Sequence, residues 1–276
     1  MRKAALLIAL CLMLLMPCAH ALERDPVLDI ALSMLEEGNP FLAQYNRLTG
    51  ANIEPRFPLG CPYFFGGSNY DAIGNGIKAW QNSTYYKKDQ TYVGGFDCAG
   101  FTKWVMKQDG RGQHPSISAL LNRSVSGELY IPVTYGVPDE YLSQYLIPGD
   151  LLCIQHASGG YHIMIYIGTL RTFGWTKDTV PPKLSRLLDY PLMIHCSSNQ
   201  DYYERYQDYV RTYKPWALPT DGGVIVSLLN APENDVDDLM VNEDHSSHYV
   251  IHFEGYNLTL YSTATDYHLE WVRWTR

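Results

Sequence analysis

The sequence has little of what marks several large classes of protein. After the N-terminal stretch, no apolar segment reaches the length of a membrane span. Basic residues are in the minority, with 21 Lys and Arg against 29 Asp and Glu, so the net charge of −8 leaves no electrostatic footprint for nucleic acid or anionic lipid. No internal repeat and no low-complexity linker divides the chain. These absences argue against a nucleic-acid-binding, membrane-spanning or repeat protein.

The N-terminal stretch itself is predicted to be a signal peptide. A basic start precedes an apolar run over residues 4–16, and residues 19–21 provide the small side chains that a signal peptidase reads. Cleavage after Ala21 would export the protein to the cell envelope or the medium. The mature chain, 22–276, has the length of a single domain.

Cysteines are few, and their spacing excludes a paired CxxC zinc site. Two of the six fall within the predicted signal peptide. Cys18 raises the alternative of a lipid anchor, against which the preceding Pro17 argues. Leaving aside Cys98, three remain, and we expect them to be buried free thiols, which behave as small apolar groups: Cys61, Cys153 and Cys196.

Helical patterns come early in the chain and strand patterns come late. Apolar residues recur at helical spacing over 26–37 and 98–109, a further short helix is expected over 39–48, and 49–97 reads mostly as loop. Apolar or alternating runs typical of strands follow at 151–154, 161–168, 192–195, 223–229, 249–254, 258–261 and 268–274. This order predicts an α+β fold in which helices pack on an antiparallel sheet.

One cysteine stands where a thiol nucleophile would need to be. Cys98 follows a glycine pair and opens a predicted helix, whose N-terminus favours a thiolate, as does an imidazolium partner. His162, near the start of a strand, is a candidate base, and His195, in a later strand, is a candidate for the group that orients its imidazole. Spacing alone does not decide, because a cysteine and a histidine occur together in most proteins.

Six short strings make the assignment more specific, because they follow one another in the order of a known family. The chain resembles the NlpC/P60 cysteine peptidases, whose nucleophile motif is similar to Phe96-Asp97-Cys98-Ala99-Gly100-Phe101. The cysteine precedes the histidine, as in the unpermuted members. The strings lie at residues 63–67, 96–101, 148–152, 161–168, 193–197 and 222–227.

The resemblance implies a papain-like fold and a role for each site residue. Cys98 would attack the scissile carbonyl, and His162 would pair with the thiolate and then protonate the leaving amine. His195 would hold the imidazole in its useful tautomer, and Tyr63 would help the Cys98 backbone N–H to stabilise the oxyanion. Asp97 would bind a free amino terminus of the substrate, although it also suits a helix cap.

The resemblance further implies a bacterial enzyme that cuts peptidoglycan stem peptides, typically between D-γ-glutamate and a diamino acid. No cofactor and no metal is implied, since the thiol does the chemistry. We expect a monomer that acts on soluble muropeptides, without a nucleic-acid partner. The alternatives are a CHAP-like peptidoglycan amidase, a catalytically silent protein that binds peptidoglycan fragments, and an acyl or peptidyl transferase.

The sequence departs from the family pattern in three places. Ala99 stands where the motif usually has serine. One insert, at about 68–95, separates the tyrosine string from Cys98, and a second, at about 169–191, separates His162 from His195. We expect both inserts to narrow the active-site cleft, because long loops beside active sites often act as lids or specificity elements.

Overall fold

The structure is a computed structural model of the whole chain. It describes residues 25–35, 43, 46–47, 50, 61, 63–68, 77–79, 81–82, 87–92, 95–125, 129–131, 139–180, 185–198, 222–231, 251–253 and 256–275. The predicted signal peptide and most of the predicted helix over 39–48 lie outside these residues. Within them, no helix combines the length and hydropathy that crossing a bilayer requires.

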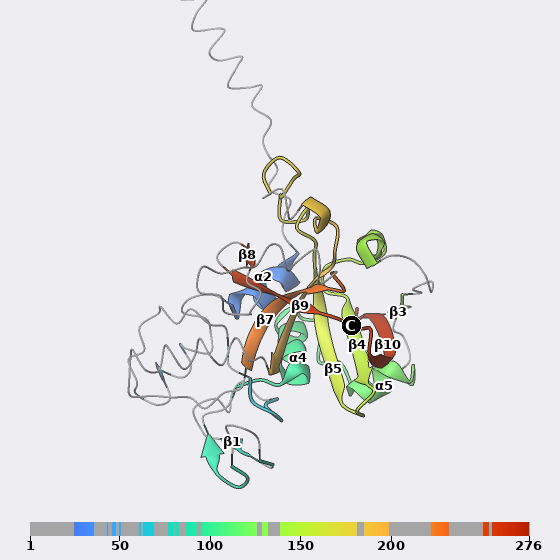
Figure 1. Ribbon diagram of the computed structural model, residues 1–276. Helices are drawn as coiled ribbons and strands as arrows, with labels where there is room; N and C mark the ends of the chain where they lie inside the picture. The colour runs from blue at the N-terminus through green and yellow to red at the C-terminus, as the bar shows by residue number, and fades with distance from the viewer. Residues whose placement is uncertain are drawn as a thin grey trace, which may run out of the picture.

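A single large sheet organises the described part of the chain (Figure 1). Its eight strands lie in the order β3-β10-β4-β5-β6-β7-β9-β8. A separate hairpin, β1 (Ile77–Lys78) and β2 (Thr91–Tyr92), lies apart from it. The sheet strands are β3 Leu129–Tyr130, β4 Leu151–His156, β5 Tyr161–Gly168, β6 Leu192–Ser198, β7 Gly222–Leu229, β8 Ile251–Phe253, β9 Tyr256–Tyr261 and β10 Asp266–Arg273.

The sheet is not wholly antiparallel, which corrects the sequence-based expectation. Strands β7 and β9 pair in parallel, with Ser227 beside Thr259, whereas every other neighbouring pair in the sheet is antiparallel. A parallel pair needs a connection that returns to the starting end of the sheet. Such a return depends on long-range pairing, which periodicity along one strand does not specify.

Among the described residues, few helices accompany this sheet, and the fold is mixed α/β. Those with described bounds are α2 (Pro26–Ser33), α4 (Cys98–Gln108), α5 (Ile117–Leu121) and a 3₁₀ helix, η2 (Asp139–Gln144). Asp25 caps α2 by accepting a hydrogen bond from the backbone N–H of Val27 at 3.0 Å. The α2 helix ends at Ser33 instead of the predicted residue 37, and α4 matches its prediction closely. Helices α5 and η2 were not predicted.

The two faces of the sheet bury separate apolar cores, as the alternation in β5 predicts. Ile163 and Ile165 face the core that α4 covers, whereas Met164 and Tyr166 face a second core that includes Leu142 of η2. Fully burying such an aliphatic side chain contributes about 1.5–3 kcal/mol to folding. The predicted buried thiols are confirmed: Cys61, Cys153 and Cys196 are buried and none is in a disulfide.

The insert at 169–191 lies at the far end of β5 from His162. It begins directly after Gly168, and β5 advances about 3.3 Å per residue, which puts its end roughly 20 Å from His162. Leu170 and Leu187 of this segment are buried in the core on the α4 side. The start of this insert therefore lies away from His162, and the expectation that the insert narrows the active-site cleft stays a prediction. The other insert contains the β1–β2 hairpin and leads directly into α4 (Figure 1).

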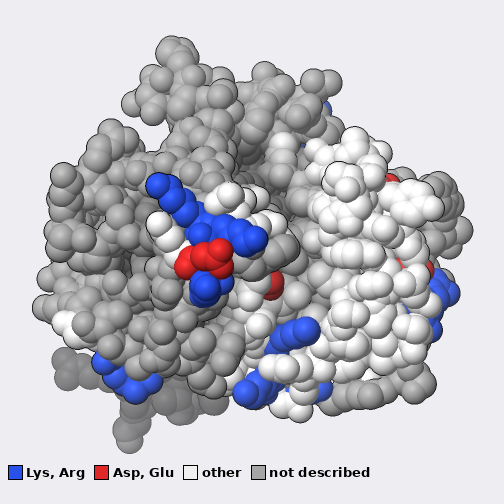
Figure 2. All heavy atoms as spheres, turned by 90° about the horizontal axis from the view of Figure 1, so that it is seen from below, with Lys and Arg blue, Asp and Glu red and all other residues white. Residues whose placement is uncertain are grey.

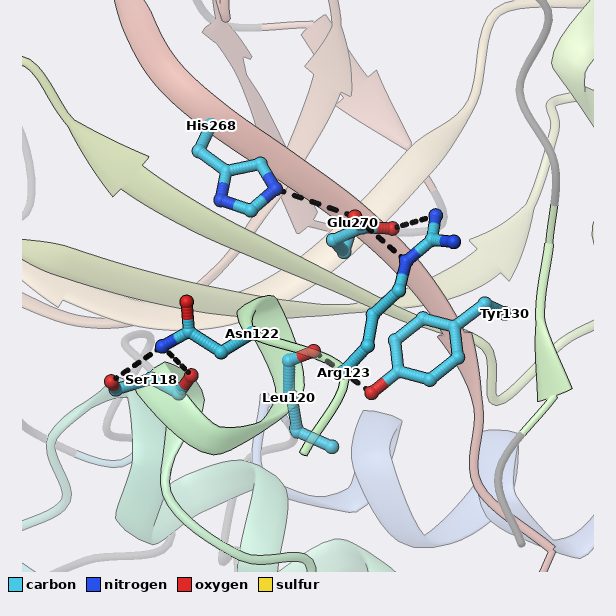
Figure 3. Close-up of polar contacts among 7 residues, drawn as sticks. All are labelled: Ser118, Leu120, Asn122, Arg123, Tyr130, His268 and Glu270. Atoms are coloured by element: carbon cyan, nitrogen blue, oxygen red, sulfur yellow. Dashed lines mark hydrogen bonds and ion pairs between the residues drawn. The ribbon is translucent and has the colours of Figure 1, made fainter. Parts of the chain in front are cut away.

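Polar contacts fasten α5 to the edge of the sheet (Figure 3). Arg123, just after α5, makes a two-pronged contact with Glu270 of β10, with nitrogen–oxygen distances of 3.1 and 2.9 Å. Its guanidinium lies 4.9 Å from the ring centroid of Tyr130, whose hydroxyl donates to the Leu120 carbonyl. Seen from below, acidic and basic side chains lie beside one another on the surface (Figure 2), and Lys78 pairs with Asp89 at 3.3 Å.

Candidate active site

Cys98 is the first residue of α4, as the sequence predicts. Asp97 is the N-cap, and its carboxylate accepts the backbone N–H of Gly100 at 2.6 Å. The backbone N–H groups of Gly66 and Ala99 also bond this carboxylate. Burial nevertheless raises the pKa of Asp97. The structure thus gives Asp97 a capping role, and binding of a substrate amino terminus by Asp97 remains a prediction.

The two glycine-containing strings meet around this helix start. The backbone N–H of Phe64 donates to the Phe96 carbonyl at 2.8 Å, and that of Asp97 donates to the Gly67 carbonyl at 2.9 Å. A Cβ atom on Gly100 would lie 1.9 Å from the Gly67 carbonyl oxygen, which is closer than any side chain can approach. Glycine at position 100 therefore lets the 63–67 string pack directly on the first turn of α4.

Tyr63 belongs to the same junction. It forms an isolated parallel bridge with Phe96, and its backbone N–H donates to the Gly222 carbonyl of β7 at 2.8 Å. The side chain is half-buried against the core on the α4 side. The structure therefore places Tyr63 next to the segment that leads into Cys98, and its oxyanion role remains a prediction.

His162 and His195 lie where β5 and β6 separate. The pairing of these strands ends at Ile165 and Ile194, whereas the pairing of β5 with β4 continues past His162 to Tyr161. Across this opening, His162 Nε2 lies 2.8 Å from His195 Nδ1, and the rings meet edge to face at 4.9 Å. The structure brings the two predicted histidines into direct hydrogen-bond contact.

The Cys98 thiol lies against the backbone of the same strand. The Ile163 backbone N–H, directly after His162, hydrogen-bonds the Cys98 sulfur and lowers its pKa, but burial and the charge of Asp97 outweigh this contact and raise the pKa to about 12. The thiol is therefore protonated at neutral pH. This differs from the sequence-based expectation of a thiolate, because desolvation outweighs the helix N-terminus.

Both histidines are neutral at rest. Burial lowers the pKa of His162 well below its usual range, and the nearby His195 and His156 lower it further. Burial alone lowers the pKa of His195 to about 3. A neutral thiol beside a neutral imidazole can exchange a proton as it attacks, which is general-base chemistry.

Tyr261, from β9, completes the aromatic surroundings of His162, and the sequence analysis missed its role. Its ring stacks on His162 at 5.8 Å and 17°, and meets His195 edge to face at 5.8 Å. Burial raises the pKa of the Tyr261 hydroxyl, and the charges of Asp266 and Cys98 raise it further. The Tyr261 hydroxyl is thus protonated, and a negative charge on the Cys98 sulfur would raise its pKa further. The predicted strand at 258–261 contained it, but nothing in that pattern indicated its neighbour.

A histidine–aspartate pair borders the other side of His162. His156 Nδ1 lies 2.7 Å from Asp266 Oδ1, and the His156 ring stacks on His162 at 6.3 Å and 25°. The second carboxylate oxygen of Asp266 is buried and has no hydrogen-bond partner. Although these side chains lie near one another, no three or more His, Cys, Asp or Glu side chains among the described residues are arranged so that they could hold a metal ion.

Comparison with known proteins agrees with this geometry. The model of the NlpC/P60 family matches residues 60–207, which is more than half of the chain. A search of the curated proteins finds no match. The matched region contains Cys98, His162 and His195, whereas Tyr261 and Asp266 lie beyond its end.

Proposed function

Because the chain belongs to the NlpC/P60 family, we propose that it is an exported cysteine peptidase that cuts stem peptides of the bacterial cell wall. The family supports a hydrolase related to the cell wall, and the mixed α/β fold is compatible with a papain-like enzyme. One observation carries the proposal for this chain. The Cys98 thiol, at the start of α4, contacts the backbone N–H of Ile163, the residue after His162. The His162 ring in turn hydrogen-bonds the ring of His195.

In the proposed mechanism, the proton moves as the carbon–sulfur bond forms. Cys98 attacks the scissile carbonyl, and the free ring nitrogen of His162 takes the thiol proton. His162 then gives this proton to the leaving amine, which leaves an acyl-enzyme for water to hydrolyse. His195 accepts a hydrogen bond from His162 and stabilises the imidazolium that forms between these steps.

The substrate contacts are proposed from the family resemblance. The backbone N–H of Cys98, with Tyr63, would stabilise the oxyanion, and the bond cut would join D-γ-glutamate to a diamino acid. Asp97 would contact the free amino terminus only through acceptor capacity left after its three backbone hydrogen bonds. Ala99 has no hydroxyl to add a further substrate contact.

Mass spectrometry of digested muropeptides tests the proposal. Mature protein should release products with a new diamino-acid amino terminus. Cys98→Ala should abolish the release, because it removes the nucleophile, while Cys153→Ala, a change to a buried thiol in the core, should keep it. A new terminus at the sugar–peptide amide would instead identify a CHAP-like amidase. Binding without turnover in the unmodified protein would identify a silent binding protein.

Chemical labelling gives a second, independent test. Cys98 is half-buried, whereas Cys61, Cys153 and Cys196 are fully buried, so an alkylating reagent should modify Cys98 first. Activity should fall in proportion to the label on Cys98. Full activity after complete alkylation of Cys98 would contradict the proposed nucleophile.

A further inference from the structure

A line of buried, hydrogen-bonded polar side chains runs from His162 of β5 across the neighbouring strands β6, β7 and β9. His195 Nε2 lies 2.8 Å from Ser227 Oγ of β7, and Ser227 Oγ lies 2.5 Å from Thr259 Oγ1 of β9. Thr259 Oγ1 also contacts the Val226 carbonyl oxygen at 3.3 Å. The parallel register of β7 and β9, which puts Ser227 beside Thr259, creates this line.

Burial leaves these groups dependent on one another. The exposed fractions are 6% for His162, 1% for His195, 1% for Ser227 and 7% for Thr259. A buried polar group that loses its partner costs free energy, so each proton should occupy the position that satisfies the whole line. The direction of the hydrogen bonds can therefore be worked out from its end.

The backbone carbonyl at the end of the line sets that direction. The Val226 oxygen can only accept, so the Thr259 hydroxyl donates to it, and Thr259 Oγ1 then accepts from the Ser227 hydroxyl. With its one proton used, Ser227 Oγ accepts from Nε2–H of His195. Neutral His195 then has a bare Nδ1, which accepts from Nε2–H of His162.

We propose that Ser227 and Thr259 are positioning residues that set the tautomer of both histidines and leave Nδ1 of His162 bare. This inference rests on the proposed function, in which that nitrogen takes the proton of Cys98. The reverse direction would put the proton on Nδ1 of His162 and remove the base. Both hydroxyls lie beyond residues 60–207, the region that the family model matches.

Two variants of Thr259 separate the effect of its hydroxyl group from the effect of its side-chain volume. Thr259→Val keeps the side-chain shape but frees the Ser227 hydroxyl to turn toward His195, whereas Thr259→Ser keeps the hydroxyl. We expect Thr259→Val to lower kcat by about 10- to 100-fold with little change in KM, since an incorrect tautomer disables the base. Thr259→Ser should stay within about 2-fold of the unmodified enzyme. Ser227→Ala, which removes the middle of the line, should resemble Thr259→Val.

Nitrogen NMR of the histidine-labelled mature protein reports the tautomers without any turnover. Both His162 and His195 should be protonated at Nε2, and Thr259→Val should move the His195 proton to Nδ1. A proton on Nδ1 of His162 in the unmodified protein would overturn the inference, as would identical spectra and kcat values for Thr259→Val and Thr259→Ser. If Cys98→Ala still hydrolyses muropeptides, the proposed function is wrong. The NMR spectra alone decide whether the tautomer assignment is correct.

Discussion

Two buried histidines in this protein, His114 and His195, are alike in burial, in pKa and in the contact at Nε2, but they differ in the group that contacts Nδ1. His114 and His195 are 2% and 1% exposed, and burial lowers the pKa of each, to about 4 and about 3 respectively. Each has a hydroxyl on Nε2: Thr102 at 2.7 Å from His114, and Ser227 at 2.8 Å from His195. Judged by burial, pKa and hydroxyl contact alone, the two sites are indistinguishable.

The groups on the other ring nitrogen distinguish them. Nδ1 of His114 lies 2.8 Å from the Pro115 carbonyl oxygen, which can only accept, so that proton is fixed on Nδ1 and the hydrogen bonds end on the backbone. Nδ1 of His195 meets a second histidine, which adjoins the residue that contacts Cys98. A buried, neutral histidine is therefore a structural element at one site and, in the proposed mechanism, part of a proton pathway at the other.

Removing each imidazole should affect different properties, and the larger effect is expected at His195. His195→Ala leaves Nε2–H of His162 without its acceptor, so kcat should fall by about 100- to 1,000-fold. His195→Asn can offer an amide oxygen near the position of Nδ1 and should recover part of the loss. Muropeptide turnover measures both variants, and equal activities for alanine and asparagine would show that orientation of His162 is not the role of His195.

His114→Ala should instead lower stability. The change leaves the Pro115 carbonyl without its donor and a space beside Trp274, against which the His114 ring packs edge to face. The expected cost is about 1–3 kcal/mol in the free energy of unfolding, measured by denaturant titration. Turnover per folded molecule should stay within about 2-fold of the unmodified enzyme. A larger loss would show that Thr102, which also contacts the Cys98 carbonyl, transmits the change to the nucleophile.

Tyr261→Phe should have a smaller effect, because the stacked ring remains. Only the hydroxyl near Cys98 is lost, and kcat should fall by about 3- to 10-fold if that hydroxyl stabilises charge during the reaction. Tyr261→Leu removes the ring that packs on His162 and should cost more. Tyr267→Phe, at an exposed tyrosine of β10, the next strand along the chain, is the control and should change nothing.

The comparison also shows how far the sequence alone leads. The three predicted site residues could be proposed from the sequence because each lies in a short string with local consequences: a capped helix start for Cys98 and alternating strands for the two histidines. The glycines that pack around the helix start belong to the same strings. Local pattern was enough to select three residues that the structure brings close together, and their catalytic roles stay predictions.

The surroundings of these residues were not predictable in the same way. Ser227, Thr259 and Tyr261 all lie in strands that the sequence pattern located, but which strand each would adjoin depends on the parallel pairing of β7 with β9. Periodicity assigns a residue to a face of a strand and does not name its partner. The short helix α5 was missed for a related reason, since five residues give too little periodicity to register.

The pH dependence of kcat/KM distinguishes a neutral pair from an ion pair at the active site. His162 must be neutral to act as base, and its pKa is lowered, so activity should hold as pH falls through 6.5 and decline only well below that value. The thiol pKa is raised to about 12, so activity should also stay level from pH 7 to about 9, where a thiolate–imidazolium pair would lose its imidazolium proton. His114→Gln should leave this profile unchanged, because His114 adjoins no reacting group. A bell-shaped profile with an alkaline limb below pH 9 would mean that Cys98 and His162 rest as an ion pair, and that the helix N-terminus outweighs burial after all.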